Sequence, residues 1–213
     1  MSGIASYTLR VARTARVEIA GDPRSASELW ILLHGYAQTA AEFLAQCSPL
    51  AREQRVLVAP EALSRFYRRG SSGPIGASWM TREARDAEIA DYVEYLDGVA
   101  RWCERELGVA SRPAILGFSQ GAATAWRWAM LGETRPSRIL SVGGGIPPDL
   151  ELSTRRAQLE GLCVDIVRGR DDAYHTAEWL ERDRARLAEL RISCDVHEFD
   201  GAHVLDAATL AAL

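Results

Sequence analysis

The sequence predicts an α/β fold with a mostly parallel, eight-stranded sheet and helices on both faces. Apolar strand-like runs alternate with amphipathic helical segments over almost the whole chain, and no repeat, low-complexity segment or linker interrupts them. That alternation is typical of a parallel sheet whose strands are connected through helices. The 213 residues also fall below the length of about 250 at which cores tend to split. We therefore expect one domain over residues 1–213.

Each predicted element follows from a local pattern. Apolar residues at three- and four-residue steps from Ile89 to Leu107 predict a long crossover helix that ends at Gly108, since glycine accepts the left-handed conformation of a helix end. Two more helices are expected over 119–131, ending at Gly132, and over 175–190. The first two strands are close enough to form a hairpin. The eight expected strands are 6–11, 16–20, 29–34, 55–59, 113–118, 138–143, 163–168 and 193–199.

Composition and charge exclude several functions. The net charge is −4, so the chain lacks the basic field that drives binding to a phosphate backbone, and we expect no nucleic-acid partner. All 25 basic residues are arginine, which excludes chemistry that needs a lysine, such as a Schiff base or a P-loop. We expect no metal or organic cofactor.

We expect a cytoplasmic protein without a membrane span. Arg10, Arg13 and Arg16 interrupt the region where a secretion signal needs an apolar stretch, and no run approaches the roughly 18 to 20 apolar residues of a spanning helix. The four cysteines form no C-x-x-C pair and are expected to be reduced thiols. Cys163 and Cys194 each begin a predicted strand, which leaves open that they are neighbours.

The strongest local signal is the pentapeptide Gly117-Phe118-Ser119-Gln120-Gly121. It directly follows an apolar strand and directly precedes a helix. In a G-x-S-x-G turn between a strand and a helix, the serine is strained and exposed above the sheet, and the glycines avoid collisions with neighbouring backbone. We therefore expect Ser119 to be a catalytic nucleophile.

A serine nucleophile needs a base within hydrogen-bond reach, and the chain has four histidines. His203 lies in a loop just past the last predicted strand and is the preferred base. His34 ends the third predicted strand and is interpreted as a structural hydrogen-bonding residue, His175 opens a helix, and His197 is interpreted as a structural histidine inside the last strand.

Asp171 and Asp172 compete as the acid that orients His203, because their turn follows a predicted parallel strand and lies at the same sheet edge. Either could instead cap the next helix. Acyl transfer also needs donors for the developing oxyanion, which are typically the amide after the nucleophile and one in the loop after the third strand. These are the amides of Gln120 and Tyr36.

Together, Leu33-His34-Gly35, the Ser119 pentapeptide, Gly169-Arg170-Asp171-Asp172 and Gly201-Ala202-His203 resemble the phospholipase/carboxylesterase family of α/β-hydrolases, which includes the acyl-protein thioesterases. The resemblance implies an α/β-hydrolase fold and selects Asp172, three residues after the turn glycine, as the acid. It also implies that Ala59-Pro60-Glu61 and Ser78-Trp79-Met80 line the acyl site. The Gly144–Pro148 loop and the segment 65–69 depart from the family pattern.

The segment Arg65-Phe66-Tyr67-Arg68-Arg69 is expected to border the cleft. It is interpreted as a solvated loop, with a sharper hypothesis that its guanidinium groups grip an anionic group of the substrate. We count Trp79, Met80, Phe66, Tyr67 and Arg68 as candidate substrate-binding residues, and Trp79 as the aromatic most exposed to an acyl chain. About 20 residues separate the sixth and seventh strands, which predicts no cap domain and an open cleft.

The predicted function is hydrolysis of a small carboxylic ester or thioester through an acyl-enzyme on Ser119, His203 and Asp172. A lysophospholipase or another acyl hydrolase, including one for lactones or peptides, would use the same residues. A non-catalytic ligand-binding protein with this fold is the alternative from a different class. The oligomeric state is left open.

Overall fold

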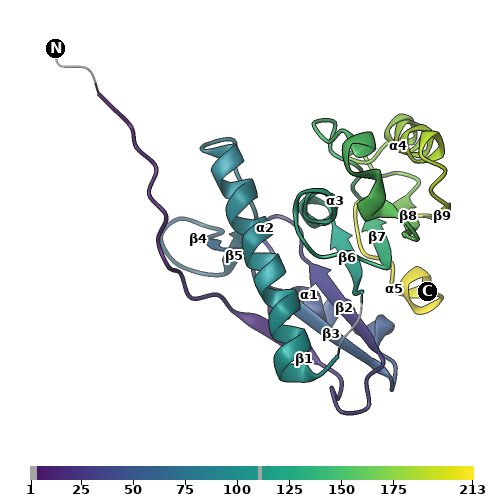
Figure 1. Cartoon of the computed structure of the whole chain (residues 1–213), viewed down its shortest axis with the longest axis horizontal. Helices are drawn as coiled ribbons and strands as arrows, with labels where there is room; N and C mark the ends of the chain where they lie inside the picture. The colour runs from purple at the N-terminus through teal and green to yellow at the C-terminus, as the bar shows by residue number, and fades with distance from the viewer. Residues whose placement is uncertain (1–3, 110–111) are drawn as a thin grey trace.

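A computed structural model describes residues 4–109 and 112–213. Its centre is a seven-stranded sheet in the order β1-β3-β2-β6-β7-β8-β9 (Figure 1). Only β1 is antiparallel, to β3, and every other neighbouring pair is parallel. The mostly parallel sheet is therefore confirmed. The strands are β1 (Val17–Ala20), β2 (Glu28–Leu33), β3 (Arg55–Pro60), β6 (Ala114–Phe118), β7 (Arg138–Val142), β8 (Cys163–Gly169) and β9 (Cys194–Phe199).

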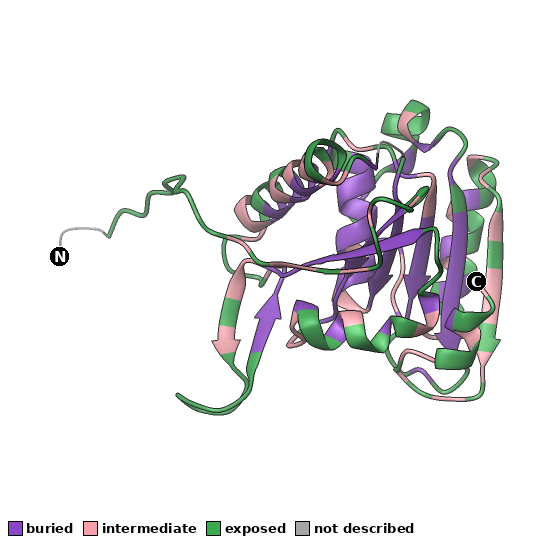
Figure 2. Ribbon diagram, turned by 90° about the horizontal axis from the view of Figure 1, so that it is seen from below, coloured by how far each residue is buried: buried purple, intermediate pink, exposed green. Residues whose placement is uncertain are grey.

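The prediction of an eighth strand at 6–11, and of a hairpin with the strand after it, is wrong. This segment is extended and unpaired, and Tyr7, Leu9 and Val11 are 82% or more exposed. Figures 1 and 2 show it leaving the body of the molecule. The alternation of apolar residues indicates only that a strand would bury one face, and it does not supply a partner. Among the described residues β1 pairs only with β3, so segment 6–11 does not pair with the outer edge of β1.

Helices cover both faces of the sheet, as predicted. One core holds side chains of α2 (Arg85–Trp102), α3 (Gln120–Leu131) and α4 (Ala177–Glu189), and the other holds those of α1 (Ala40–Gln46) and α5 (Ala207–Ala211). Along β2, Leu29, Ile31 and Leu33 enter the first core while Trp30 and Leu32 enter the second, as the period of two in a strand requires. The resulting buried layer of strands lies between the helices in Figure 2.

Helix α2 forms the predicted long crossover. It continues through a π-helical turn, Cys103–Leu107, and ends at Gly108 with φ 67°, the left-handed conformation expected of that glycine. Helix α3 ends at Gly132, also as predicted. Short 3₁₀ segments occur at Ser48–Leu50 and Leu152–Leu159.

A small hairpin of β4 (Ser64–Tyr67) and β5 (Ile75–Ser78) stands outside the main sheet. Segment 65–69, which overlaps β4, was predicted to be a loop. The hairpin is anchored beside β2, because the Ala37 N–H donates to the Ala77 carbonyl at 2.9 Å. Gly76 permits this close approach, since a Cβ there would lie 2.6 Å from the Ala37 carbonyl oxygen.

The connection from β7 to β8 contains only the 3₁₀ segment Leu152–Leu159, so no helical cap is inserted there. No helix within residues 4–109 or 112–213 has the length and apolar character needed to span a bilayer. A single domain over 1–213 and a cytoplasmic location stay predictions, and positions 1–3 and 110–111 of that domain lie outside the described residues.

Candidate active site

Ser119 sits on a strained turn between β6 and α3. Its φ and ψ are 54° and −114°, a region that costs a residue with a side chain on the order of 1–3 kcal/mol. The glycines of the pentapeptide make the turn possible. A Cβ on Gly117 would lie 2.3 Å from the Gly121 carbonyl oxygen, and one on Gly121 would lie 1.9 Å from that of Leu33. The turn therefore presents the serine above the carboxyl edge of the sheet.

His203 reaches the serine from the loop that follows β9. Its Nε2 lies 2.9 Å from Ser119 Oγ, and its Nδ1 lies 2.8 Å from Asp172 Oδ2. Since an ionised carboxylate can only accept, Nδ1 carries the proton and donates to Asp172. Nε2 is then unprotonated and accepts from the Ser119 hydroxyl.

Asp172, not Asp171, makes this contact. Asp172 is 4% exposed, whereas Asp171 lies at the surface. The second oxygen of Asp172 accepts from the N–H groups of Tyr174 at 2.8 Å and His175 at 3.0 Å. Neither aspartate caps the next helix, because Thr176 is the N-cap of α4.

These contacts hold Asp172 ionised. Burial disfavours the charged form and on its own would raise the pKa of Asp172. The N–H of His175, the His203 imidazole and the N–H of Tyr174 outweigh that effect, and the pKa of Asp172 lies below its ordinary value. The pair is therefore prepared to stabilise an imidazolium on His203.

The two predicted oxyanion donors, Gln120 and Tyr36, follow Ser119 and β2 respectively. Gln120 is the first residue of α3, where a backbone N–H has no acceptor within the helix. Tyr36 follows β2, and among the described residues its N–H donates to no protein acceptor. Both amides thus have hydrogen-bonding capacity left for an oxygen of a substrate.

Below these amides, His34 and Trp79 form a buried support. The His34 Nε2 accepts from the Ala62 N–H at 3.1 Å, and its Nδ1 lies 2.8 Å from the Gly35 carbonyl oxygen, the structural role predicted for it. Burial lowers the pKa of His34. Trp79 is only 3% exposed and donates from Nε1 to the His34 carbonyl at 2.9 Å, so the prediction that its ring is exposed is wrong.

The contacts of the Gln120 side chain were not predicted from the sequence. Gln120 Oε1 accepts from the Trp79 N–H at 3.0 Å, and Nε2 donates to the Met80 carbonyl at 2.8 Å. Met80 remains partly exposed. The residue after the nucleophile therefore fixes the 78–80 segment beside the serine, in addition to offering its N–H.

The remaining candidate substrate-binding residues lie on the hairpin. Phe66 is half-buried and stacks on the exposed ring of Tyr36 at 5.3 Å, and Tyr67 is 50% exposed. Arg68 pairs with Glu42, and Arg65 pairs with the buried Glu61 at 2.6 Å. Two of the three arginines in the segment thus already have carboxylate partners within the chain.

Two aromatic rings enclose His203, and neither was predicted to touch it. Phe118 lies 5.0 Å and Tyr174 4.7 Å from the imidazole centroid. Phe118 is nearly buried, while Tyr174 is 76% exposed. A signal existed in the sequence, because Phe118 directly precedes Ser119 and Tyr174 lies two residues after Asp172.

The cysteines stand apart from this site. Cys194 is in register with Val164, not with Cys163, and successive side chains of a strand face opposite sides of the sheet. All four cysteines are free thiols. Burial raises the pKa of Cys47 to about 12 and that of Cys103 to about 11.

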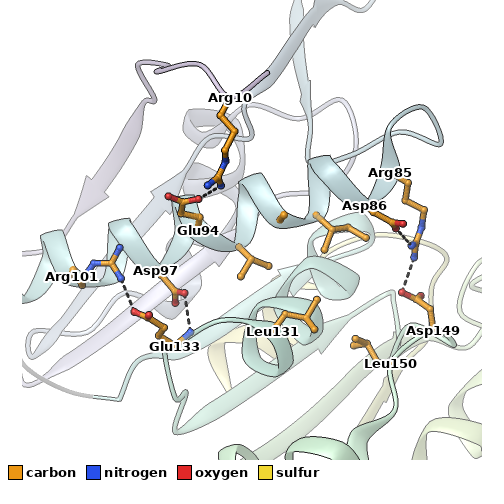
Figure 3. Close-up of a pocket in the computed structure, with 13 residues that line it drawn as sticks. Arg10, Arg85, Asp86, Glu94, Asp97, Arg101, Leu131, Glu133, Asp149 and Leu150 are labelled. Carbon is orange, nitrogen blue, oxygen red and sulfur yellow. Dashed lines mark hydrogen bonds and ion pairs between the residues drawn. The ribbon is translucent and has the colours of Figure 1, made fainter. Parts of the chain in front are cut away.

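A cavity of about 740 Å³ lies elsewhere, between α2, the N-terminal segment and the Asp149 region. Figure 3 shows that its charged side chains pair with one another: Arg10 with Glu94, Arg85 with Asp149, and Arg101 with Glu133. Ser119, His203 and Asp172 do not line this cavity. It is therefore not the cleft of this site.

The chain has an α/β-hydrolase fold, and Ser119, Asp172 and His203 follow β6, β8 and β9 and form one hydrogen-bonded series. No family model and no curated protein matches the sequence. Solved structures do match. A carboxylesterase from Mesorhizobium loti superposes with a TM-score of 0.74 at 16% identity, covering 93% of each chain.

Two further structures have the same fold. A phospholipase/carboxylesterase from Dyadobacter fermentans gives a TM-score of 0.71 at 16% identity, over 95% of this chain and 96% of its own. A Bacillus cereus carboxylesterase gives 0.71 at 13% identity, over 93% and 91%. The fold predicted from the motif resemblance is confirmed by these neighbours.

Proposed function

We propose that this protein is a serine hydrolase that cleaves small carboxylic esters or thioesters through an acyl-enzyme. The observation that carries the proposal is the continuous hydrogen-bonded series from Ser119 Oγ through the His203 imidazole to Asp172, at 2.9 and 2.8 Å. The esterases among its structural neighbours support the same class of reaction.

In the first half-reaction, Ser119 Oγ attacks the acyl carbon while His203 Nε2 takes the hydroxyl proton. The amides of Tyr36 and Gln120 donate to the oxygen that becomes negative. Asp172 stabilises the resulting imidazolium. Collapse of the tetrahedral intermediate breaks the bond to the leaving group, which takes the proton from His203 and departs as an alcohol or thiol.

In the second half-reaction, a water attacks the acyl-serine and gives a proton to His203 Nε2. The imidazolium then returns that proton to Ser119 Oγ as the carboxylic acid leaves. No step needs a lysine or a cofactor, which agrees with the composition of the chain. We place Met80, Phe66, Tyr67 and Arg68 along the rim that a substrate meets, with Trp79 as the buried floor.

The proposal is tested with a fluorophosphonate probe and a substrate panel. The panel consists of p-nitrophenyl esters of increasing acyl length, a matched acyl-thioester and a lysophospholipid. We expect covalent labelling of Ser119 and turnover of at least one ester or thioester. Absence of labelling would contradict the proposal, and stoichiometric labelling without turnover would favour the non-catalytic ligand-binding alternative.

A further inference from the structure

The loop of residues 143–150, here the Gly143 loop, forms one wall of the site. It follows β7, and Gly143 has φ 56°. A Cβ at Gly143 would lie 3.1 Å from His203 Cε1 and Nδ1, and one at Gly144 would lie 2.7 Å from the Ser119 carbonyl oxygen. The loop backbone is therefore in contact with both the imidazole and the serine turn, and its position limits where His203 can lie.

Helix α4 holds this loop through one carboxylate and two arginines. Asp183 Oδ2 accepts from the Ile146 N–H at 2.9 Å. Arg182 donates to the Ile146 carbonyl at 3.0 Å, and Arg186 donates to the carbonyls of Ile146 at 3.2 Å and Pro147 at 3.1 Å. Both hydrogen-bonding groups of the Ile146 backbone are thus taken by the helix.

At its far end the loop is held by the other helices. Asp149 pairs with Arg127 of α3 at 2.9 Å. It also pairs with Arg85 of α2 at 2.7 Å (Figure 3). Burial alone would raise the pKa of Asp149, but the two arginines lower it to about 2.

The loop is therefore fixed at both ends. Next to His203, the Gly143 N–H donates to the Val167 carbonyl at 2.9 Å and Ser141 Oγ donates to the Gly144 carbonyl at 2.8 Å. Helix α4 fixes the following residues through Ile146.

Asp183 also lies against the turn that carries Asp172. Its Oδ2 is 3.6 Å from His175 Nε2, and Asp183 and His175 are 0% and 1% exposed. Within the described residues, neither ring nitrogen of His175 has a hydrogen-bond partner, so this carboxylate is the polar group that the Nε2 approaches. The backbone N–H of the same histidine donates to Asp172.

We infer that Asp183 is a positioning residue for His203, which it places by fixing the Gly143 loop through Ile146 and the Asp172 turn through His175. Both supports meet the same part of the imidazole: Asp172 accepts from Nδ1, and a Cβ at Gly143 would lie 3.1 Å from Nδ1 and Cε1. A fully buried carboxylate is costly unless it is paired. Arg182 pairs with Asp183 Oδ1 at 2.9 Å, and the Ile146 N–H donates to Oδ2 at 2.9 Å.

This inference rests on the proposed function, and it is tested with Asp183→Asn in the full chain. Asparagine keeps the volume but has one acceptor oxygen, which cannot serve both Ile146 and Arg182. We expect kcat on the best p-nitrophenyl ester to fall about 10- to 100-fold, since small displacements of catalytic groups have effects of this size. KM should stay within about twofold, because no candidate substrate-binding residue contacts Asp183.

A spectroscopic measurement separates positioning from general loss of stability. In ¹H NMR, the proton on His203 Nδ1 that is shared with Asp172 resonates far downfield, and Asp183→Asn should shift or broaden it. The matched control is Asp165→Asn. Asp165 is also a buried carboxylate with an arginine and a histidine partner, Arg138 at 2.6 Å and His197 at 2.9 Å, but it contacts neither the Gly143 loop nor the triad.

Gly145→Ala changes the loop side of the contact between the Gly143 loop and Asp183. It replaces Asp183→Asn as the test if that variant does not fold. A Cβ at Gly145 would lie 2.0 Å from Asp183 Oδ2 and 3.1 Å from His175 Nε2, so it must push the loop off the helix and lower kcat similarly. Its control is Gly98→Ala on α2, where a Cβ meets nothing within 4 Å.

The inference is overturned if folded Asp183→Asn or Gly145→Ala keeps kcat within twofold of wild type, or if Asp165→Asn loses as much activity as Asp183→Asn. Failure of the proposed function has a different result: the wild-type chain itself would then neither react with a fluorophosphonate at Ser119 nor turn over any ester or thioester.

Discussion

Two histidine–aspartate pairs join the strand β8 region to the strand β9 region, and their chemistry is nearly the same. His197 and Asp165 meet at 2.9 Å within the strands, and His203 and Asp172 meet at 2.8 Å in the loops beyond them. Both aspartates are buried. Among residues 4–109 and 112–213, only the second pair has a serine within hydrogen-bond reach of the other ring nitrogen.

The two pairs differ in their position relative to the sheet. The carboxyl ends of parallel strands meet at one edge of the sheet, and there loops from β6, β8 and β9 converge. Within the sheet, Asp165 is also bound by Arg138 at 2.6 Å, which compensates its charge and leaves the pair a structural tie. A histidine–aspartate pair therefore becomes a candidate for catalysis through what its free ring nitrogen faces.

Removal of the serine hydroxyl should have the largest effect. Ser119→Ala takes away the nucleophile that distinguishes the His203 pair, so kcat should fall by something on the order of 10⁶. Ester hydrolysis and fluorophosphonate labelling measure this. Retention of labelling on the variant would place the nucleophile elsewhere.

Neutralising the orienting acid should have the next largest effect. Asp172→Asn leaves the volume unchanged but removes the acceptor that fixes the tautomer of His203, and kcat should fall by about 10⁴. Asp171→Asn is the matched control, because that side chain is exposed, and it should change kcat less than twofold. The reverse ranking would assign the acid to Asp171.

Substitution in the His197–Asp165 pair should lower the stability of the fold and leave the catalytic rate unchanged. Burial raises the pKa of Asp165, but Arg138 and His197 outweigh it and lower the pKa below the ordinary value. Asp165→Asn should therefore reduce the free energy of unfolding by about 1 to 3 kcal/mol at neutral pH, with kcat unchanged, as urea denaturation and ester assays would show.

The lowered pKa of Asp165 determines how the stability difference between wild type and Asp165→Asn depends on pH. A carboxyl with a lowered pKa in the folded state stabilises the protein above its unfolded pKa of about 4. The gap between wild type and Asp165→Asn should hold above that pH, shrink below it, and disappear as the pH falls through the folded pKa. A gap that widened in acid would contradict the assigned ion pairs.

The smallest effect is expected at the rim. Arg68 pairs with Glu42 at a partly exposed position, and such pairs contribute about 0 to 1 kcal/mol. Arg68→Ala should change the ratio of anionic to neutral ester hydrolysis less than threefold. A selective loss of anionic esters would instead support the hypothesis that this segment grips a charged group of the substrate.

Local patterns in the sequence were sufficient for the seven strands of the main sheet, for the helices α2, α3 and α4 and for the turn at Ser119, but not for the hairpin of β4 and β5 or the unpaired segment 6–11. The glycines around Ser119 are required by short backbone contacts, so their spacing reports the turn directly. The helix end at Gly108 is readable for the same reason, since a positive φ favours glycine. The choice between the two aspartates came from the motif resemblance.

Other features depend on contacts between segments far apart in the chain. Nothing in the alternation of residues 6–11 reveals that this segment runs away from the sheet instead of pairing with β1. The indole Nε1–H of Trp79 donates to the His34 carbonyl, and the backbone N–H of Trp79 donates to the Gln120 side chain. No local signal predicts either contact.

The sequence by itself determined the alternation of strands and helices, the serine turn and the chemical types available for a triad, because each depends on neighbouring residues and backbone sterics. Only the tertiary structure decided which histidine faces the serine, which arginines are already paired, and that Asp183 connects the Gly143 loop to His175. These depend on the register of strands and the packing of helices, where residues separated by many positions compete for the same space.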